Sequence, residues 1–422
     1  MNNNETMTQA NQLVNQQQWK EAGTLFRQLW ENENNAYAAS RYLFCLRKGG
    51  YAAWSIKQGK VALNQFPDNK YIKNELTWAY YEDGIKTAET EEDLQKLIES
   101  AKIILDLQPD TLPKELTIFA VIKLAKQKGQ WNIVLDWCNK LDPETISNEP
   151  AIIDGRKGMS KKEQWFFAKV KSLIELELWK EARSWALAAT KIYPREIHFY
   201  RFSALALANL GEEEKAINEF NNIILKYREE WYILQDLSDL YLRINQPEKA
   251  LNFACRAALS AGEDKLKVTL YENIAKQSLL LQKLEMSARH LELCKAIRQR
   301  EGWPIRGNLQ QLELEIRQAF TTQKFNWFTG DNFDQLIKLC RKDWQESLYQ
   351  DVPRYCGIID SLPPNQKHGW IISDDGKRIF FLQKELPPFL RKEKQKVSFV
   401  LTENYDRKKD RMSVKAVDLK SI

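Results

Sequence analysis

The pattern of Leu178-Trp179-Lys180-Glu181-Ala182 recurs along the chain. Its copies are Gln18-Trp19-Lys20-Glu21-Ala22, Gly211-Glu212-Glu213-Glu214-Lys215-Ala216 and Gln246-Pro247-Glu248-Lys249-Ala250. The alanines at 182, 216 and 250 follow one another at intervals of 34 residues. Self-similarity with a period of about 20 to 50 residues is typical of repeat architectures. The sequence therefore predicts a stack of similar units rather than one large core.

Each copy lies between two segments with helical patterning. The segment before Gly211, residues 203–210, is rich in Leu and Ala, and the helix after Ala182 is expected to stop at Pro194. Proline cannot continue a helix because it lacks an amide N–H and its ring clashes with the preceding turn. The small alanine lets the two helices approach closely, and the neighbouring Trp or Tyr fills the gap to the next pair. Because one pair cannot bury its apolar face alone, the pairs are expected to stack.

This pattern resembles the tetratricopeptide-repeat family over roughly residues 5–300. The resemblance implies an α-solenoid of paired antiparallel helices, with a groove that binds a protein partner. About eight pairs are predicted, near 6–32, 36–65, 71–107, 112–140, 160–193, 197–227, 231–261 and 265–300. Residues 148–162 are predicted to form an exposed loop. Further helices at 308–323 and 331–342 are predicted to cap the last repeat.

The composition and periodicity of the sequence change after Asp351. Helical periodicity stops there, and short runs rich in Ile, Val and Phe begin. Five strands separated by polar turns are predicted, at Tyr355–Asp360, Gly369–Ser373, Arg378–Leu382, Lys396–Thr402 and Ser413–Leu419. Five short strands in about 70 residues are typical of an OB-type β-barrel. The predicted fold class is mostly α, an α-solenoid followed by a small five-stranded β-barrel. The predicted parts are repeats over 1–300, capping helices and a linker over 301–350, and the barrel over 351–422.

The order of motifs in the predicted barrel is similar to that of cold-shock domains. The motifs are Gly357-Ile358-Ile359, Lys367-His368-Gly369-Trp370-Ile371-Ile372, Asp374-Asp375-Gly376-Lys377-Arg378-Ile379-Phe380-Phe381, Val397-Ser398-Phe399 and Ala416-Val417-Asp418-Leu419. The resemblance covers about 355–420. It implies that outward aromatic side chains on two adjacent strands stack unpaired bases, while nearby cations hold the phosphate backbone.

Alternation along the strands selects the residues for this role. His368 and Trp370 are two residues apart and therefore share one face of a strand, and Phe380 takes an outward position on the next strand. Lysines and arginines flank these rings, and a second basic group lies in the last turn. The predicted nucleic-acid-binding residues are Lys367, His368, Trp370, Lys377, Arg378, Phe380, Arg407, Lys408, Lys409 and Arg411.

Several positions depart from the cold-shock pattern. Ser361 stands where the family has a first-strand Trp, and Leu382 stands where it has a third-strand His. Lys367 replaces a glycine, and His368 takes an aromatic position. At least two stacking positions are therefore lost. A second interpretation stays open, in which the barrel aromatics pack against the helices and no nucleic acid binds.

The charge distribution singles out the same part of the chain. The chain carries a net charge of +6, and residues 352–422 contain 15 Lys and Arg against 9 Asp and Glu, which accounts for all of it. The preceding residues are neutral by count. A localised basic excess indicates an anionic partner for the barrel.

Residues typical of catalysis or metal binding are scarce. No glycine-rich phosphate loop or nucleophile motif is present, and none of the three histidines His198, His290 and His368 is expected to lie near a cysteine or a second histidine at ligand spacing. No enzyme activity, cofactor or metal is predicted. The beginning of the sequence lacks signal-peptide features and no CxxC occurs, so a cytoplasmic protein without a membrane span is expected.

These observations predict a non-enzymatic adaptor. The repeats would bind a protein partner, and the barrel would bind single-stranded nucleic acid, with RNA favoured over DNA. Such an architecture would suit a bacterial RNA-regulation or defence assembly. The alternative is a protein–protein scaffold or accessory subunit in which the barrel is a docking module.

Overall fold

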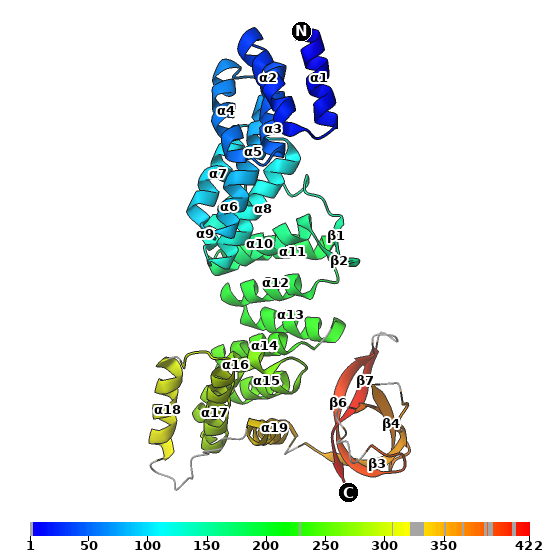
Figure 1. Cartoon of the computed structure of the whole chain (residues 1–422). Coiled ribbons are helices and arrows are strands. Elements are labelled where there is room, and N and C mark those ends of the chain that lie inside the picture. The colour runs from blue at the N-terminus through cyan, green and yellow to red at the C-terminus, as the bar shows by residue number, and fades with distance from the viewer. Residues whose placement is uncertain are drawn as a thin grey trace. The chain divides into compact units, whose positions relative to one another are not determined.

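The computed structural model describes the chain except residues 1–2, 228, 306, 321–332, 350–351, 365–366, 384–385, 387–390 and 407–410 and the side chains of 153 and 404–406. Two compact units are present, Met1–Ala189 and Thr190–Ile422. The predicted fold class is confirmed, because the described residues form mostly paired helices followed by a closed five-stranded barrel (Figure 1).

Antiparallel helices follow one another through the first unit (Figure 1). Its helices are α1 (Asn3–Asn15), α2 (Trp19–Glu33), α3 (Ala36–Lys48), α4 (Ala52–Gln65), α5 (Lys70–Tyr80), the π-helix η1 (Tyr81–Ile85), α6 (Lys86–Thr90), α7 (Leu94–Asp106), α8 (Thr111–Gln127), α9 (Trp131–Cys138), α10 (Lys161–Glu175) and α11 (Trp179–Ile192), which ends beyond the boundary. Side-chain oxygens of Asn35, Asn69 and Asp93 accept backbone amides at the starts of α3, α5 and α7. These caps satisfy donors that have no partner within the helix.

The second unit continues the same pattern of helices. They are α12 (Ile197–Asn209), α13 (Glu213–Lys226), α14 (Trp231–Arg243), α15 (Pro247–Leu259), the 3-10 helix η2 (Asp264–Lys267), α16 (Val268–Leu280), α17 (Leu284–Arg300), α18 (Gly307–Phe320) and α19 (Phe333–Tyr349). The repeat alanines explain the sequence period, because Ala182, Ala216 and Ala250 are all completely buried near the starts of α11, α13 and α15. A larger side chain at these positions would hold the paired helices apart.

Polar contacts join the first helices of successive pairs in the second unit. Arg201 on α12 donates to both carboxylate oxygens of Asp236 on α14. Asn273 on α16 donates to Asp239 on α14 over 3.0 Å. Burial, with the neighbouring Asp236 charge, raises the pKa of Asp239 to about 6. These contacts fix the order of the pairs in addition to their apolar packing.

Residues 148–162, predicted as a loop, contain a short antiparallel hairpin. Its strands are β1 (Pro150–Ile153) and β2 (Arg156–Ser160). Asp154 and Gly155 form the turn with φ of 49° and 73°. Positive φ at both central residues is the geometry of a two-residue hairpin turn, and Asp-Gly is one of its preferred sequences.

The barrel closes through pairing between distant strands. Its strands are β3 (Arg354–Ser361), β4 (His368–Ser373), β5 (Arg378–Leu382), β6 (Lys396–Asp406) and β7 (Arg411–Ser421). Their order is β3-β4-β5-β7-β6, and β6 pairs with β3 to close the sheet. Only the β5–β7 pair is parallel among the described strand pairs. The inward side chains form one apolar core, which includes Ile359, Ile371, Phe381 and Phe399.

Gly357 permits the close approach of β3 to β4. A Cβ atom at this position would lie 2.5 Å from the carbonyl oxygen of Ile372 and 2.9 Å from the Cα of Ser373. Any side chain would therefore push the two strands apart. The glycine that opens the predicted first strand has a packing role in the barrel.

Two further observations concern the length of the apolar helices and the state of the cysteines. Among the described residues, no helix is long and apolar enough to cross a membrane. All six cysteines are free thiols, and five are buried while Cys356 is exposed.

Candidate nucleic-acid interface

Three aromatic rings gather on the outward face of β4 and β5. Trp370 on β4 lies directly opposite Phe380 on β5 in the antiparallel register. The Phe380 ring centroid lies 5.8 Å from that of Trp370 and 5.6 Å from that of His368. All three rings are half-buried, whereas the alternate residues Gly369, Ile371 and Phe381 are buried. Strand alternation thus leaves the rings outside the barrel core, as the sequence predicts.

Gly369 determines how closely this aromatic group sits on the core. A Cβ atom at Gly369 would lie 2.6 Å from Cζ of the buried Phe381 and 2.9 Å from the carbonyl oxygen of Ser361. The missing side chain lets the Phe381 ring fill the space beneath β4. The strand between His368 and Trp370 is therefore supported from inside, which holds the outward rings in place.

Arg378 is positioned over the Trp370 ring, with its guanidinium carbon 4.8 Å from the ring centroid. Its Nε and Nη2 each lie 3.0 Å from Oδ2 of Asp360 on β3, which holds the guanidinium in place. A cation over an indole face is a favourable contact. The same geometry would let Arg378 sandwich a base or contact a phosphate. However, Asp360 balances part of its charge.

Lys377 is also paired with a carboxylate. Its Nζ lies 2.7 Å from Oδ2 of Asp375, and the Ser373 hydroxyl donates to the same carboxylate. The hydrogen bonds from Lys377 and Ser373 lower the pKa of Asp375 to about 2. Since both partners are exposed, salt screens this pair. Lys377 and Arg378, both predicted to contact nucleic acid as cations, are thus each paired with an aspartate.

Lys415 is a cation that the sequence analysis missed. It lies on β7 directly beside Phe380, in the parallel register of β5 and β7, and beside Thr402 of β6. It is half-buried, while the next residue, Ala416, is buried, so Lys415 shares the outward face with Phe380. Within the described residues, no carboxylate lies at ion-pair distance from Lys415. The barrel thus adds a cation beside the aromatic group.

The other predicted residues are distributed around this face. Lys367 is exposed and immediately precedes β4, and its carbonyl oxygen accepts the amide of Gln383 over 2.9 Å. Arg411 is exposed at the start of β7, four residues before Lys415, or about 13 Å along a strand. Arg407, Lys408 and Lys409 lie outside the described residues. The structure therefore groups His368, Trp370, Arg378 and Phe380, with Lys367 and Lys377 at the strand ends.

The departures from the cold-shock pattern occupy the same face. Ser361 lies opposite Trp370 across β3 and β4, at a register irregularity, and its hydroxyl is 3.4 Å from Nη2 of Arg378. Leu382 lies opposite His368. A hydroxyl and an aliphatic side chain thus stand where the resemblance predicts rings. Three outward rings remain on this face, His368, Trp370 and Phe380.

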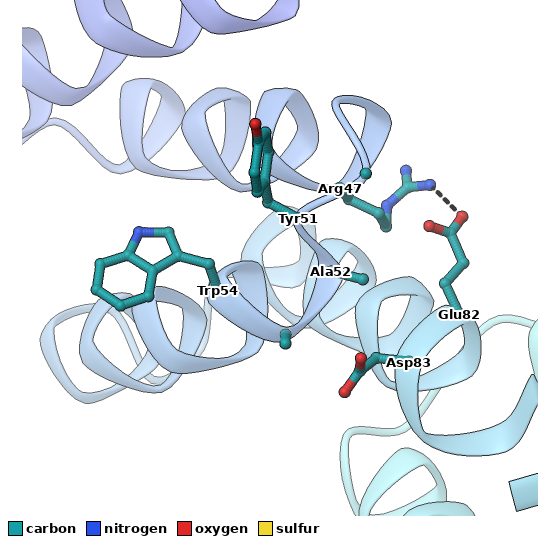
Figure 2. A pocket seen from close by; sticks show the side chains of 8 residues that line it. Arg47, Tyr51, Ala52, Trp54, Glu82 and Asp83 are labelled. Atoms are coloured by element: carbon teal, nitrogen blue, oxygen red, sulfur yellow. Dashed lines mark hydrogen bonds and ion pairs between the residues drawn. The ribbon is translucent and has the colours of Figure 1, made fainter. Parts of the chain in front are cut away.

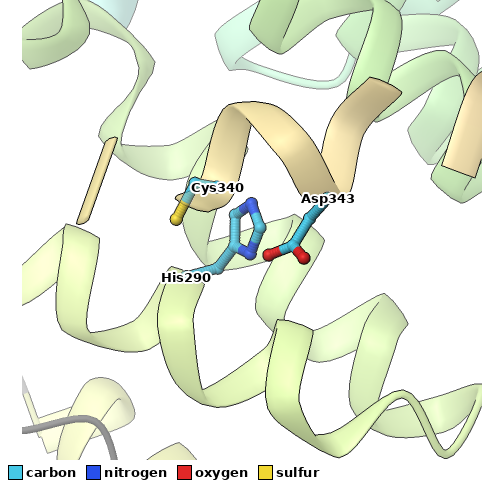
Figure 3. Close-up of side chains that lie close together, drawn as sticks. All are labelled: His290, Cys340 and Asp343. Carbon is cyan, nitrogen blue, oxygen red and sulfur yellow. The ribbon is translucent and has the colours of Figure 1, made fainter. Parts of the chain in front are cut away.

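A second cluster of polar side chains joins α17 to α19 in the helical part. One ligand-type atom each from His290, Cys340 and Asp343 lies within 4.8 Å of the others, and all three residues are buried (Figure 3). Their separation of about 50 residues hid this grouping from an analysis of sequence spacing. The expectation that no histidine lies near a cysteine is therefore wrong, because His290 lies close to Cys340 in space and only four residues before Cys294 in the sequence.

Hydrogen bonds already occupy the atoms that would bind a metal in this cluster. Trp344 Nε1 donates to His290 Nε2 over 2.6 Å, so His290 Nδ1 carries the proton and donates to the Met286 carbonyl oxygen over 2.7 Å. Asp343 accepts two hydrogen bonds from Arg289, of 2.7 and 2.8 Å. Burial raises the pKa of the Cys340 thiol, which disfavours the thiolate that a metal needs. The arrangement fits a satisfied core histidine.

Acid should weaken the second unit through His290. Burial lowers the pKa of His290 from 6.5 to about 4. The unfolded chain therefore binds more protons, so this contribution to stability is complete above about pH 6.5 and is lost as the pH falls toward about 4. Between about pH 7 and pH 5, urea unfolding should show wild type losing roughly 2 kcal/mol more than a His290→Gln variant. Equal losses in the two proteins would contradict the neutral, buried histidine.

Comparisons with known proteins give one family model and several solved structures. A family model described as "Domain of unknown function (DUF7017)" matches residues 197–326. No curated protein matches the chain.

Among solved structures, a human IFIT1 dimer with PPP-AAAA has 12% identity and a TM-score of 0.40, covering 81% of this chain and 80% of that chain. The TPR2AB domain of yeast Sti1 in complex with an HSP90 peptide has 15% identity and a TM-score of 0.29, covering 76% and 97%. A tetratricopeptide repeat protein from Parabacteroides merdae has 12% identity and a TM-score of 0.31, covering 66% and 98%. At such low scores these similarities carry no inference about ligands.

Proposed function

We propose that the chain is a non-enzymatic adaptor whose barrel binds single-stranded nucleic acid, with RNA preferred, while its helix pairs bind a protein partner. The observation that carries the proposal is the group of three outward rings, His368, Trp370 and Phe380, on two adjacent strands. Unpaired bases stack on such rings whatever their sequence, because every base has a π face. Free thiols, including the exposed Cys356, favour a reducing compartment such as the cytoplasm.

The charges around the rings support a polyanionic ligand. Lys415 stands beside Phe380 and Lys367 precedes β4, so cations flank the aromatic face on two sides. The full net charge of +6 lies in residues 352–422. In a nucleic-acid complex these cations would contact phosphates, and the Ser361 hydroxyl beside Trp370 is available to a ribose.

A titration of the full chain with fluorescein-labelled single-stranded RNA and DNA tests this proposal. Oligonucleotides of about 12 nucleotides are long enough for one such barrel. We expect saturable binding that weakens between about 50 and 200 mM salt. If Lys367, Lys415 and Arg378 neutralise two or three phosphates, the slope of log K against log salt should be about −1.4 to −2.

A duplex of the same sequence is the matched control, because its bases cannot reach the rings. Equal binding to the duplex would mean that charge alone attracts nucleic acid. The absence of saturable single-strand binding would end the nucleic-acid proposal. Purification of the tagged full chain with and without nuclease separates partners held by protein contacts from partners held through nucleic acid.

A barrel that docks on protein is the second candidate, and a specific observation favours it. Ile358 on β3 and Ile372 on β4 are directly paired, and their side chains are 41% and 39% exposed. This apolar pair adjoins Arg378, whose charge Asp360 already balances. An exposed apolar pair beside aromatic rings suits a protein interface. In that case single-stranded RNA would not bind, and replacing both isoleucines by serine would release a protein partner.

A further inference from the structure

A pocket opens in the first unit beside the turn that joins α3 to α4. Arg47, the turn residues Gly50 and Tyr51, and Ala52, Ala53 and Trp54 at the start of α4 line it, with Glu82 and Asp83 of η1 on the other side (Figure 2). Its volume is about 580 Å³. Sites of this size hold one large side chain or a small molecule.

The π-helix η1 places the two acidic residues at the pocket. The amide of Lys86 donates to the carbonyl oxygen of Tyr81, five residues earlier, which widens the helix at this point. Gly84 within it is buried, and a Cβ there would lie 2.6 Å from the Ser100 hydroxyl oxygen. Single π-turns inside helices occur often at functional sites. The local distortion is therefore held in place by packing against α7.

The charges of the pocket leave an excess of acid. Arg47 is buried and pairs with both Glu75 and Glu82, each at 2.9 Å. Glu75 lies outside the lining, so within the pocket wall Arg47 balances Glu82, and Asp83 leaves one carboxylate in excess. Within the described residues, Asp83 has no ion pair of its own. The lining would attract a cation and repel a phosphate.

Two aromatic rings on the pocket wall are exposed. Tyr51 is 59% exposed and Trp54 is 44% exposed, although large aromatic side chains usually pack inside helical repeats. Lys57, one turn later on α4, holds its Nζ 4.8 Å from the Trp54 ring centroid. The indole therefore already attracts a cation on one face. Its environment is suited to cation–π contacts.

We propose that this pocket receives an arginine side chain from a protein partner of the adaptor. The inference rests on the protein-binding half of the proposed function and names the chemistry of the partner. A guanidinium is planar, so it can stack on an exposed ring such as Trp54 or Tyr51, and its paired N–H groups can also bind a carboxylate such as that of Asp83. Lysine offers a point charge without a stacking face, so it fits less well.

Binding of small amides to the full chain tests the proposal. The probes are N-acetyl-arginine amide, N-acetyl-lysine amide and the uncharged isostere N-acetyl-citrulline amide, followed by saturation-transfer NMR. For one side chain we expect a Kd on the order of 1 mM for the arginine probe. The lysine probe should bind at least about 3-fold more weakly, and the citrulline probe at least about 5-fold more weakly.

Two variants locate the binding and one controls for charge. Asp83→Asn, which keeps the shape, and Trp54→Ala, which removes an exposed ring, should each weaken arginine binding by about 5-fold or more. Asp106→Asn, an exposed aspartate of α7 outside the pocket, should leave it unchanged. Equal binding of the arginine and citrulline probes, or an unchanged Asp83→Asn variant, would overturn the proposal. Neither result touches the RNA titration, which reports the barrel separately.

Discussion

Replacing Trp370 by alanine should weaken binding of single-stranded RNA to the full chain by about 5- to 160-fold. The range follows from stacking free energies of roughly 1 to 3 kcal/mol per base. Trp370 lies opposite Phe380 and packs edge-on against both other rings. Its loss also removes the surface on which Arg378 lies. The buried side chains of β4 point the other way, so the barrel core should survive the change.

Conservative and charge variants separate stacking from attraction. Trp370→Phe keeps a platform and should cost less than Trp370→Ala, while Trp303→Ala removes an exposed ring elsewhere and should cost nothing. Lys415→Ala should make the salt slope shallower by about 0.7, whereas Trp370→Ala should leave the slope unchanged. Fluorescence anisotropy at several salt concentrations gives both quantities. An alanine variant that binds as wild type does would show that the rings are not the stacking surface.

The helical repeats could be predicted from sequence because their signal is local and periodic. Ala182, Ala216 and Ala250 are fully buried at equivalent helix starts, so the 34-residue interval records a real packing constraint. The hairpin at Asp154 and Gly155 could also be predicted from the sequence. Asp-Gly beside Ile152 and Ile153 is a hairpin signal, whereas the glycines and the proline of residues 148–162 favour a loop when they are considered alone.

The barrel site was only partly predictable, because its composition depends on how distant strands meet. Alternation alone placed His368, Trp370 and Phe380 on the outside. The aspartate that holds Arg378 comes from β3, and Lys415 reaches Phe380 only because β7 joins β5 in parallel. Neither contact has a sequence spacing that reveals it. The same reason applies to His290 and Cys340, which meet through the packing of α17 and α19.

Arg354→Ala should destabilise the barrel by about 2 to 4 kcal/mol. Arg354 on β3 donates to the Asp418 carboxylate over 2.6 Å and to the Asp418 carbonyl oxygen over 2.7 Å, both on β7. It also donates to the carbonyl oxygen and hydroxyl of Ser398 on β6, each over 3.2 Å. One guanidinium therefore joins three strands at the closure of the barrel. Removing Arg354 takes away most of the hydrogen bonds that compensate the buried Asp418 carboxylate, and the loss of one partner of such a pair is costly.

The expected loss is large because Asp418 is only 4% exposed and occupies a left-handed backbone position, with φ of 48°. After the substitution, Lys420, at 3.1 Å, is the ion-pair partner that Asp418 keeps among the described residues. Hydrogen-exchange mass spectrometry should show faster exchange in β3, β6 and β7, with α2 to α4 unchanged. Arg354→Lys should give an intermediate effect, because an ammonium cannot reproduce the forked contacts. Arg27→Ala, which removes an exposed ion pair within one helix, should have no measurable effect on the barrel. If Arg354→Ala leaves exchange in β3 and β7 as slow as in wild type, strand pairing and the apolar core would be sufficient to close the barrel.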